Sequence, residues 1–275
     1  MFFILVSSAV LWGAEKPVDL ALIDAAKRNE HARIRTLLVQ GAYVDAQDVR
    51  NMTPLMWAAR SGYLESVDAL LRGKAKLNIK DHDGWTALTW ASIRGHEATV
   101  VRLLGGGAEP NVKDAGGHTP LMYAAEFGHL KTVRSLLQSG ARLNEYNREG
   151  HSALMYAAFR GETDMVVFLV GQGAEIDGSK SQEGWTPLMW AASRGRSRTV
   201  QSLLQNGSNI NARDKNGTTA LSFASAQGNI ETVKILLAGG ANVRIRDANG
   251  ETALSEAKRE GFGEIVKLLE KAGAK

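Results

Sequence analysis

Histidine, aspartate and glycine clusters are the parts of this sequence that could do chemistry. The 275-residue chain contains no cysteine, which excludes disulfides, thiol catalysis and thiolate zinc sites. His96-Glu97 begins like a zinc-protease motif, but Val100 stands where that motif needs its second histidine. Asp81-His82-Asp83-Gly84 resembles a fragment of a calcium loop without the downstream glutamate, and turn formation explains it better. These fragments predict no catalytic centre, and we expect no cofactor and no metal.

The composition is that of a folded chain. Hydrophobic residues make up 44% of it and charged residues 23%, which is enough apolar surface to build a core. The net charge of +4 is a mild excess for this length. Because it is too small to indicate nucleic-acid binding by itself, we expect no nucleic-acid partner.

The N-terminal residues carry a short apolar run from Phe2 to Trp12. A membrane-spanning helix needs roughly 20 apolar residues, so no stable span is expected, whereas a signal peptide has an apolar region of this length. Two features oppose a signal peptide, because no Lys or Arg precedes the run and cleavage after Ala14 places bulky Trp12 near the cut. On the length of the apolar run, residues 1–14 are nevertheless predicted to be a signal peptide of an exported (periplasmic or secreted) protein. The alternative is a mis-started or frayed N-terminus on a cytoplasmic protein.

The elements that position all these residues repeat along residues 15–275. Thr53-Pro54-Leu55 recurs at intervals of 33, 33, 33, 34, 33 and 33 residues, as Thr86-Ala87-Leu88, Thr119-Pro120-Leu121, Ser152-Ala153-Leu154, Thr186-Pro187-Leu188, Thr219-Ala220-Leu221 and Thr252-Ala253-Leu254. A fixed period in this range indicates a solenoid of identical units. Counting an earlier unit without the Thr-Pro start, we expect eight units, near residues 18–50, 51–83, 84–116, 117–149, 150–183, 184–216, 217–249 and 250–275.

The residue pattern of each unit predicts two helices with a glycine at the end of the first. Thr53 is a helix N-cap, and Pro54 suits the first helical position because its missing N–H costs no hydrogen bond there. Gly62 occupies the end of the first helix, where a left-handed residue is needed, and an apolar stripe follows at helical spacing. Gly or Asn before the next cap predicts a tight turn. The fold class is therefore an all-α solenoid of stacked helix-turn-helix units with short β-hairpin loops.

This pattern resembles the ankyrin repeat family. The segments that carry the resemblance are TPLMWAARSG at 53–62, TPLMYAAEFGH at 119–129 and TPLMWAASRG at 186–195. The family commonly has His after the Thr-Pro-Leu triplet, where this chain has Met, Thr or Ser, so the hydrogen bonds of that His are expected to be missing. The next slot is mostly aromatic, with Trp57, Trp90, Tyr123, Tyr156, Trp190 and Phe223. We interpret this aromatic ladder as part of the core, with a ligand platform as the alternative.

By the resemblance, the hairpin tips and first helices form a concave surface that binds partners. The candidate partner-binding residues are Trp85, Trp185, His118, His151, Arg94, Arg160 and Arg194. The tryptophans and histidines occupy the slot before the cap, which also holds Met52 and which we expect to be exposed. The arginines share a slot at the end of the first helix and suggest an acidic protein partner. The alternatives are tryptophans folded against their own hairpins and arginines that are merely solvated.

We therefore expect a monomeric, non-catalytic protein-interaction module or scaffold that binds its partner on the concave face. The alternative is a small-molecule-binding or enzyme-accessory protein that uses the aromatic ladder. The first reading requires a long open face, whereas the second requires a closed pocket with convergent titratable groups.

The export hypothesis makes a direct prediction. Mature protein isolated from its native host should begin near Glu15, and replacing Leu5 by Arg should block processing because it interrupts the apolar run. N-terminal sequencing of the mature protein checks this, and an intact Met1 would place the protein in the cytoplasm.

Overall fold

The computed structural model describes residues 16–275, so the predicted signal peptide lies outside the described residues. These residues form sixteen helices and no strand. The first helices of the units are α1 (Pro17–Lys27), α3 (Pro54–Ser61), α5 (Ala87–Arg94), α7 (Pro120–Glu126), α9 (Ala153–Arg160), α11 (Pro187–Ser193), α13 (Ala220–Ala226) and α15 (Ala253–Arg259). The second helices are α2 (His31–Val39), α4 (Leu64–Arg72), α6 (Glu97–Gly105), α8 (Leu130–Gln138), α10 (Thr163–Gly171), α12 (Ser197–Gln205), α14 (Ile230–Ala238) and α16 (Gly263–Lys271).

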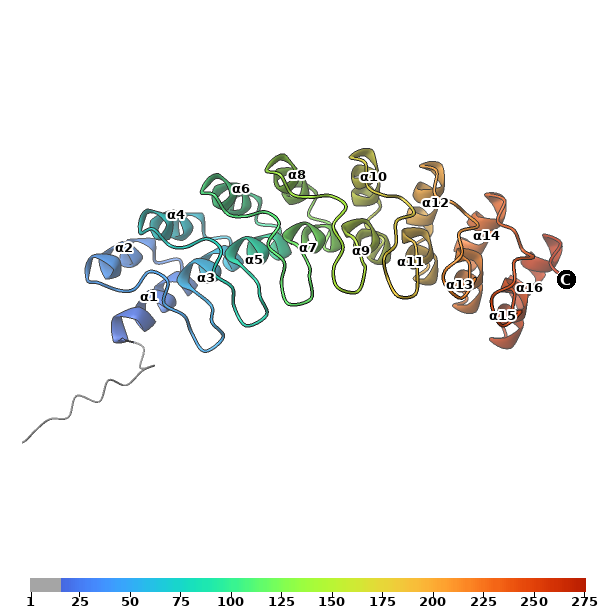
Figure 1. The fold of residues 1–275 in the computed structure, drawn as a ribbon, viewed down its shortest axis with the longest axis horizontal. Coiled ribbons are helices and arrows are strands. Elements are labelled where there is room, and N and C mark those ends of the chain that lie inside the picture. The colour runs from blue at the N-terminus through green and yellow to red at the C-terminus, as the bar shows by residue number, and fades with distance from the viewer. Residues whose placement is uncertain (1–15) are drawn as a thin grey trace, which may run out of the picture.

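The helix pairs stack into an elongated, curved array (Figure 1). The odd-numbered helices and the loops lie along the inner side of the curve, and the even-numbered helices lie along its outer side. Each odd-numbered helix packs against the odd-numbered helices before and after it, and the even-numbered helices pack in the same way from α2 to α8 and from α10 to α16. The predicted all-α solenoid is confirmed. Within residues 16–275 no helix is both long enough and apolar enough to cross a lipid bilayer.

The caps begin the first helices as predicted, with sulfur in a role that the sequence did not indicate. The Thr53 hydroxyl accepts a hydrogen bond from the Met56 backbone N–H at 3.3 Å, and the Met56 sulfur accepts one from the Thr53 N–H at 3.4 Å. The same reciprocal pair joins Thr119 to Met122 and Thr186 to Met189. The hydrogen bonds expected to be missing at this slot are therefore partly replaced by weak bonds to a thioether.

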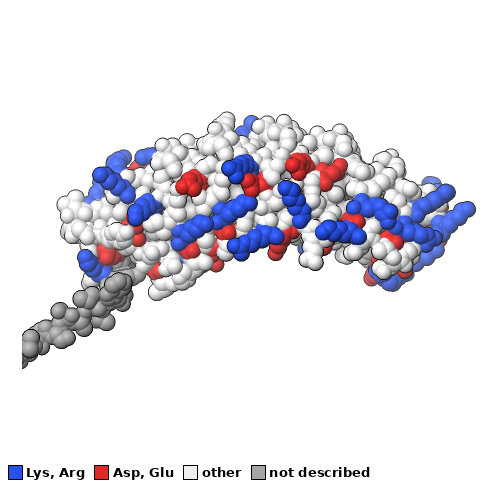
Figure 2. Space-filling model, viewed as in Figure 1, with Lys and Arg blue, Asp and Glu red and all other residues white. Residues whose placement is uncertain are grey.

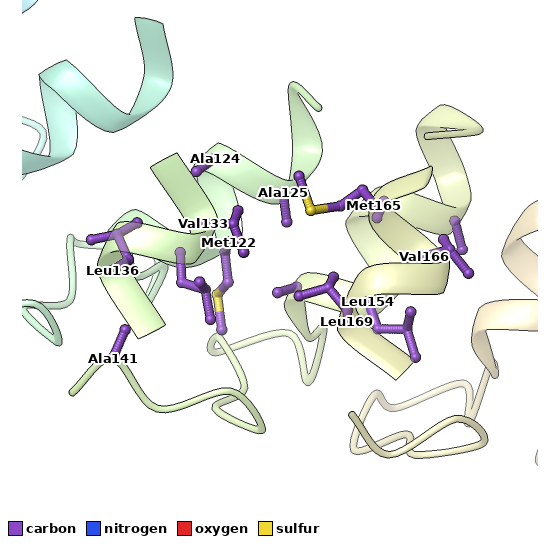
Figure 3. Close-up of a cluster of buried hydrophobic side chains, with 14 of the residues drawn as sticks. Met122, Ala124, Ala125, Val133, Leu136, Ala141, Leu154, Met165, Val166 and Leu169 are labelled. Atoms are coloured by element: carbon purple, nitrogen blue, oxygen red, sulfur yellow. The ribbon is translucent and has the colours of Figure 1, made fainter. Parts of the chain in front are cut away.

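The core lies between the two rows of helices and runs through the whole array. Ala58 and Ala59 are fully buried, so their small side chains let α3 approach its neighbours closely. In the middle of the array, Met122 of α7 points toward Val133 and Leu136 of α8 (Figure 3). Because each unit covers only one side of the next, burial is completed by stacking.

The loops are turns whose tips touch the neighbouring loop. In the loop before α5, the Asp81 N–H donates to the Trp85 carbonyl at 3.0 Å, which closes a hairpin-like turn. These loops fold back as expected, but among the described residues none contains a β-strand. Gly117 has a φ of +84°, and a Cβ there would meet the Arg148 backbone nitrogen at 2.9 Å, so both the turn and the contact between adjacent loops require glycine.

The helix-ending glycines provide a test of the fold. Gly128 has a φ of +71°, so replacing it by Val should lower the free energy of unfolding by about 1–3 kcal/mol. Gly105 is the matched control, because it is helical and a Cβ there meets no atom within 4 Å. Urea denaturation followed by circular dichroism measures both changes, and equal stability of the two variants would contradict this description of the helix end.

Candidate functional site

A carboxylate in each of several loops joins the loop to the aromatic ladder on the first helix. Asp81 Oδ1 accepts the backbone N–H groups of Asp83 at 3.0 Å and Trp85 at 2.9 Å, which closes the turn. Asp81 Oδ2 accepts the indole N–H of Trp90 at 2.9 Å. Asp48 and Trp57 make the same 2.9 Å bond in the preceding unit. The aspartates that resembled calcium loops therefore serve turns and indoles, and within residues 16–275 no three acidic or histidine side chains form a metal-binding group.

The loop between the fifth and sixth units breaks this pattern. Ser181 stands in place of the aspartate. Its hydroxyl accepts the backbone N–H groups of Gly184 at 2.9 Å and Trp185 at 3.3 Å and lies 3.3 Å from the Ser179 hydroxyl, but it bonds to no indole. Trp190 Nε1 is consequently buried without a hydrogen-bond partner among the described residues. The loop that contains Ser181 is also the one with an extra residue. The aromatic ladder therefore has one indole whose N–H lacks a hydrogen bond, that of Trp190 in the sixth unit.

The slot before the cap is not the exposed column that the sequence predicts. Met52 is fully buried, and Trp85 is half-buried. The Trp85 indole N–H lies 3.0 Å from both Asp114 Oδ2 and the Tyr123 hydroxyl, and its ring packs edge-on against Trp90 with centroids 4.6 Å apart. The expectation of exposure was wrong for both residues, because side chains in this slot fold back over the aromatic ladder and reach the next unit.

Trp185 is also half-buried, but it is held differently. Its ring packs against Trp190 at 4.7 Å and against Phe223 at 4.2 Å. No described residue accepts a hydrogen bond from its indole N–H, and the side chain lines an open groove. The structure thus separates two tryptophans that the sequence treats as equivalent: Trp85 is bonded into the array, whereas Trp185 keeps a free donor.

The two candidate histidines differ in the same way. His118 lies between Asp114 Oδ1, 3.2 Å from its Nδ1, and the Tyr156 hydroxyl, 2.9 Å from its Nε2. The hydrogen bond to Asp114 is the main cause that raises the pKa of His118. His151 instead packs edge-on against Trp190 at 5.3 Å, and burial lowers its pKa. His118 is therefore part of a polar hydrogen-bond network, whereas His151 packs against Trp190 as an uncharged aromatic ring.

Tyr156 and Asp114 complete that network. Burial raises the pKa of Tyr156 to about 12, so its hydroxyl stays protonated. Burial alone would raise the pKa of Asp114, but hydrogen bonds from His118, Tyr123 and Trp85 together hold it below its usual value. Asp114 is therefore a carboxylate at neutral pH, and the network connects three successive units.

The candidate arginines on the inner side differ in their contacts. Arg94, Arg160 and Arg194 are all exposed. Arg160 is paired with Glu126 at 2.6 Å, and Arg194 lies over the Phe159 ring at 4.3 Å. Within residues 16–275, Arg94 and Arg194 join no ion pair.

Sequence reasoning missed two residues on this face. Arg60 lies over the rings of Trp57 and Trp90, at 5.2 and 4.8 Å. Phe159 packs edge-on against Trp190 at 5.3 Å. The signal for Phe159 was its slot, which holds Glu126 in the unit before and Ser193 in the unit after. An aromatic side chain there is not needed to build the helix.

The ladder predicts unequal effects of the same substitution. Trp90→Phe removes an N–H that donates to a carboxylate, so the free energy of unfolding should fall by about 1.5–3 kcal/mol. Trp190→Phe removes an N–H without a partner and should cost at least about 1 kcal/mol less. Trp90→Ala should cost about 3–5 kcal/mol because Trp90 is buried. Urea denaturation measures all three, and equal losses from the two Phe variants would contradict the bonding described here.

The histidines predict titrations on opposite sides of the usual value of about 6.5. NMR titration should place the pKa of His118 above it and that of His151 below it, with the signals assigned from His118→Gln and His151→Gln variants. Because the folded-state pKa of His118 is raised, its contribution to stability is complete below pH about 6.5 and is lost as the pH rises through the folded value. The difference in melting temperature between the wild type and His118→Gln should therefore be larger at low than at high pH, and a pH-independent difference would refute the Asp114–His118 bond.

Comparison with known proteins agrees with the geometry. The family model described as ankyrin repeats (3 copies) matches residues 22–114, 73–147, 93–180, 121–214 and 188–275. A search of curated proteins gives no match to the chain. Because the overlapping family matches run from residue 22 to residue 275 and the helices stack in the expected pairs, the chain belongs to the ankyrin repeat family.

Proposed function

We propose that this protein is a non-catalytic scaffold that holds a partner protein along the inner side of its curve. Ankyrin repeats are in general protein–protein interaction modules. The observation that carries the proposal for this chain is the pair Arg94 and Arg194, exposed cations without ion pairs on the inner helices. Helix formation does not need them, because Phe127 and Gln227 fill the same slot in other units.

The charge of this face favours an acidic partner. On the side of the array that faces the viewer in Figure 2, next to this face, Lys and Arg side chains also form a broken band with Asp and Glu between them. The chain as a whole has 33 Lys and Arg against 29 Asp and Glu, so the placement of the charges carries the argument rather than their total. Cations on α5 and α11 are left to attract carboxylates of the partner, and such attraction mainly speeds association. The chain acts as a monomer in this proposal, and it does so outside the cytoplasm if residues 1–14 are a signal peptide.

The experiment captures the partner and then measures its association. The purified chain is immobilised, exposed to an extract of its native host, and the bound proteins are identified by mass spectrometry. Against the purified partner, the double variant Arg94→Glu and Arg194→Glu should lower the association rate constant at least about tenfold and flatten its dependence on salt.

Lys131→Glu is the matched control. It makes the same change of charge as Arg94→Glu or Arg194→Glu alone, at an exposed position on α8 on the outer side of the curve, and should leave association nearly unchanged where each of those single variants slows it. If the control slows association as much as the inner-face variant does, net charge is responsible and the proposed binding face is wrong.

A further inference from the structure

The break in the aromatic ladder coincides with the main hollow on the loop side of the array. An apolar pocket of about 160 Å³ lies between the fifth and sixth units, lined by Met155, Tyr156, Phe159, His151, Glu149 and Trp190. It adjoins an open groove of about 820 Å³, because Glu149, His151 and Trp190 line both. We call the two together the anchor groove. Its walls come from α9, α11 and the loops that precede α9, α11 and α13.

The pocket has the size and surface of a site for one apolar side chain. Its rings stand edge-on to one another, with Phe159 and His151 both 5.3 Å from Trp190. In general, a dry apolar cavity of about 150 Å³ holds a benzene ring. His151 adds no charge at neutral pH, because burial lowers its pKa. An aromatic or large aliphatic side chain would therefore fill the pocket.

The rim of the anchor groove is mainly cationic. Arg148, Lys180 and Lys215 line the open part. On the other side of the pocket, Arg194 lies 4.3 Å above the Phe159 ring. These four cations face two carboxylates, those of Glu149 and Glu183, and Glu149 is already 3.3 Å from His151 Nδ1.

The rim excludes a basic occupant and favours an acidic one. Arg194 already makes a cation–π contact with the Phe159 ring, which a cationic ligand would otherwise contact. The Arg160 guanidinium lies 5.9 Å from the same ring. The excess of positive charge attracts carboxylates on both sides of the apolar pocket.

We propose that the anchor groove binds an extended acidic segment of a partner protein, with one aromatic or large aliphatic side chain in the pocket and flanking Asp or Glu residues against Arg148, Lys215 and Arg194. The proposal rests on the proposed function and specifies its anchoring contact. Two features of the chain support it. Phe159 is aromatic at a slot that is polar in both neighbouring units. The Trp190 indole N–H lacks the hydrogen bond to an aspartate that the indoles of Trp57 and Trp90 make.

The test selects ligands without assuming their sequence. A display library of random twelve-residue peptides is selected on the full chain, and Kd values of the enriched peptides are measured by fluorescence anisotropy. The expected peptides carry one aromatic or large aliphatic residue flanked by Asp or Glu.

Variants of the chain locate the peptides. Phe159→Ser, which installs the residue found at the same slot of the next unit, should raise their Kd at least about tenfold. Arg194→Glu should raise the Kd of acidic peptides and leave matched peptides with Asn and Gln flanks nearly unchanged. Phe127→Ser is the control, because Phe127 is 44% exposed and lies outside the pocket. Circular dichroism melting of each variant verifies that it folds.

The outcomes separate this inference from the proposed function. Failure to enrich any peptide, enrichment of basic peptides, or equal binding to the wild type and Phe159→Ser would overturn the anchor groove. Peptides insensitive to Phe159→Ser but sensitive to Arg94→Glu would leave the inner face as a binding surface and remove only the pocket. Concentration-dependent dimerisation that Phe159→Ser abolishes would show a second copy in the groove and also overturn the proposal.

Discussion

The bond from a loop carboxylate to an indole or phenol on the following helix is the interaction on which the inner face depends. One oxygen of Asp81 closes a turn through backbone N–H groups, and the other holds the Trp90 ring against the core. A loop and a helix that would otherwise move separately are thereby fixed to each other. Because the same side chain performs both tasks, a change at this one position alters the loop and the ladder together, as Ser181 does in the loop before α11.

The side-chain bonds that cross from one unit to the next give each part of the face a different character. In the middle of the array, Asp114 receives bonds from Trp85 of its own unit and from His118 of the next, and His118 in turn contacts Tyr156 of the unit after that. Polar groups in this network satisfy one another, so little is left for a ligand. Toward the sixth unit the network ends, and aromatic side chains line the groove. A chain of nearly identical units thus acquires local chemistry through a few substitutions in equivalent slots.

The repeat explains why the fold could be read from the sequence and the site could not. Thr53, Pro54 and Gly62 act within a few residues of their own positions, so local rules predict the helices and their ends. The exposure of Met52 and Trp85 could not be predicted in the same way. Such burial depends on side chains far away in the sequence, as for Trp85, which contacts Tyr123 of the next unit, 38 residues away. Comparing equivalent slots identified the arginines, and the same comparison applied to Phe159 would have indicated the pocket wall.

The contacts between loop tips set a spacing along the inner side. The Arg148 N–H donates to the Gly116 carbonyl at 2.9 Å, and the Lys215 N–H donates to the Glu183 carbonyl at 2.9 Å, so successive hairpins lie edge to edge. Two extended segments per hairpin, each about 4.8 Å wide, match the roughly 8–10 Å between packed helices, so both layers advance by the same step. An extended polypeptide rises about 3.3 Å per residue. In the proposed function, an extended ligand running along the array would therefore meet an equivalent slot of the next unit about every third residue, so binding would depend on the spacing of its side chains as well as on their chemistry.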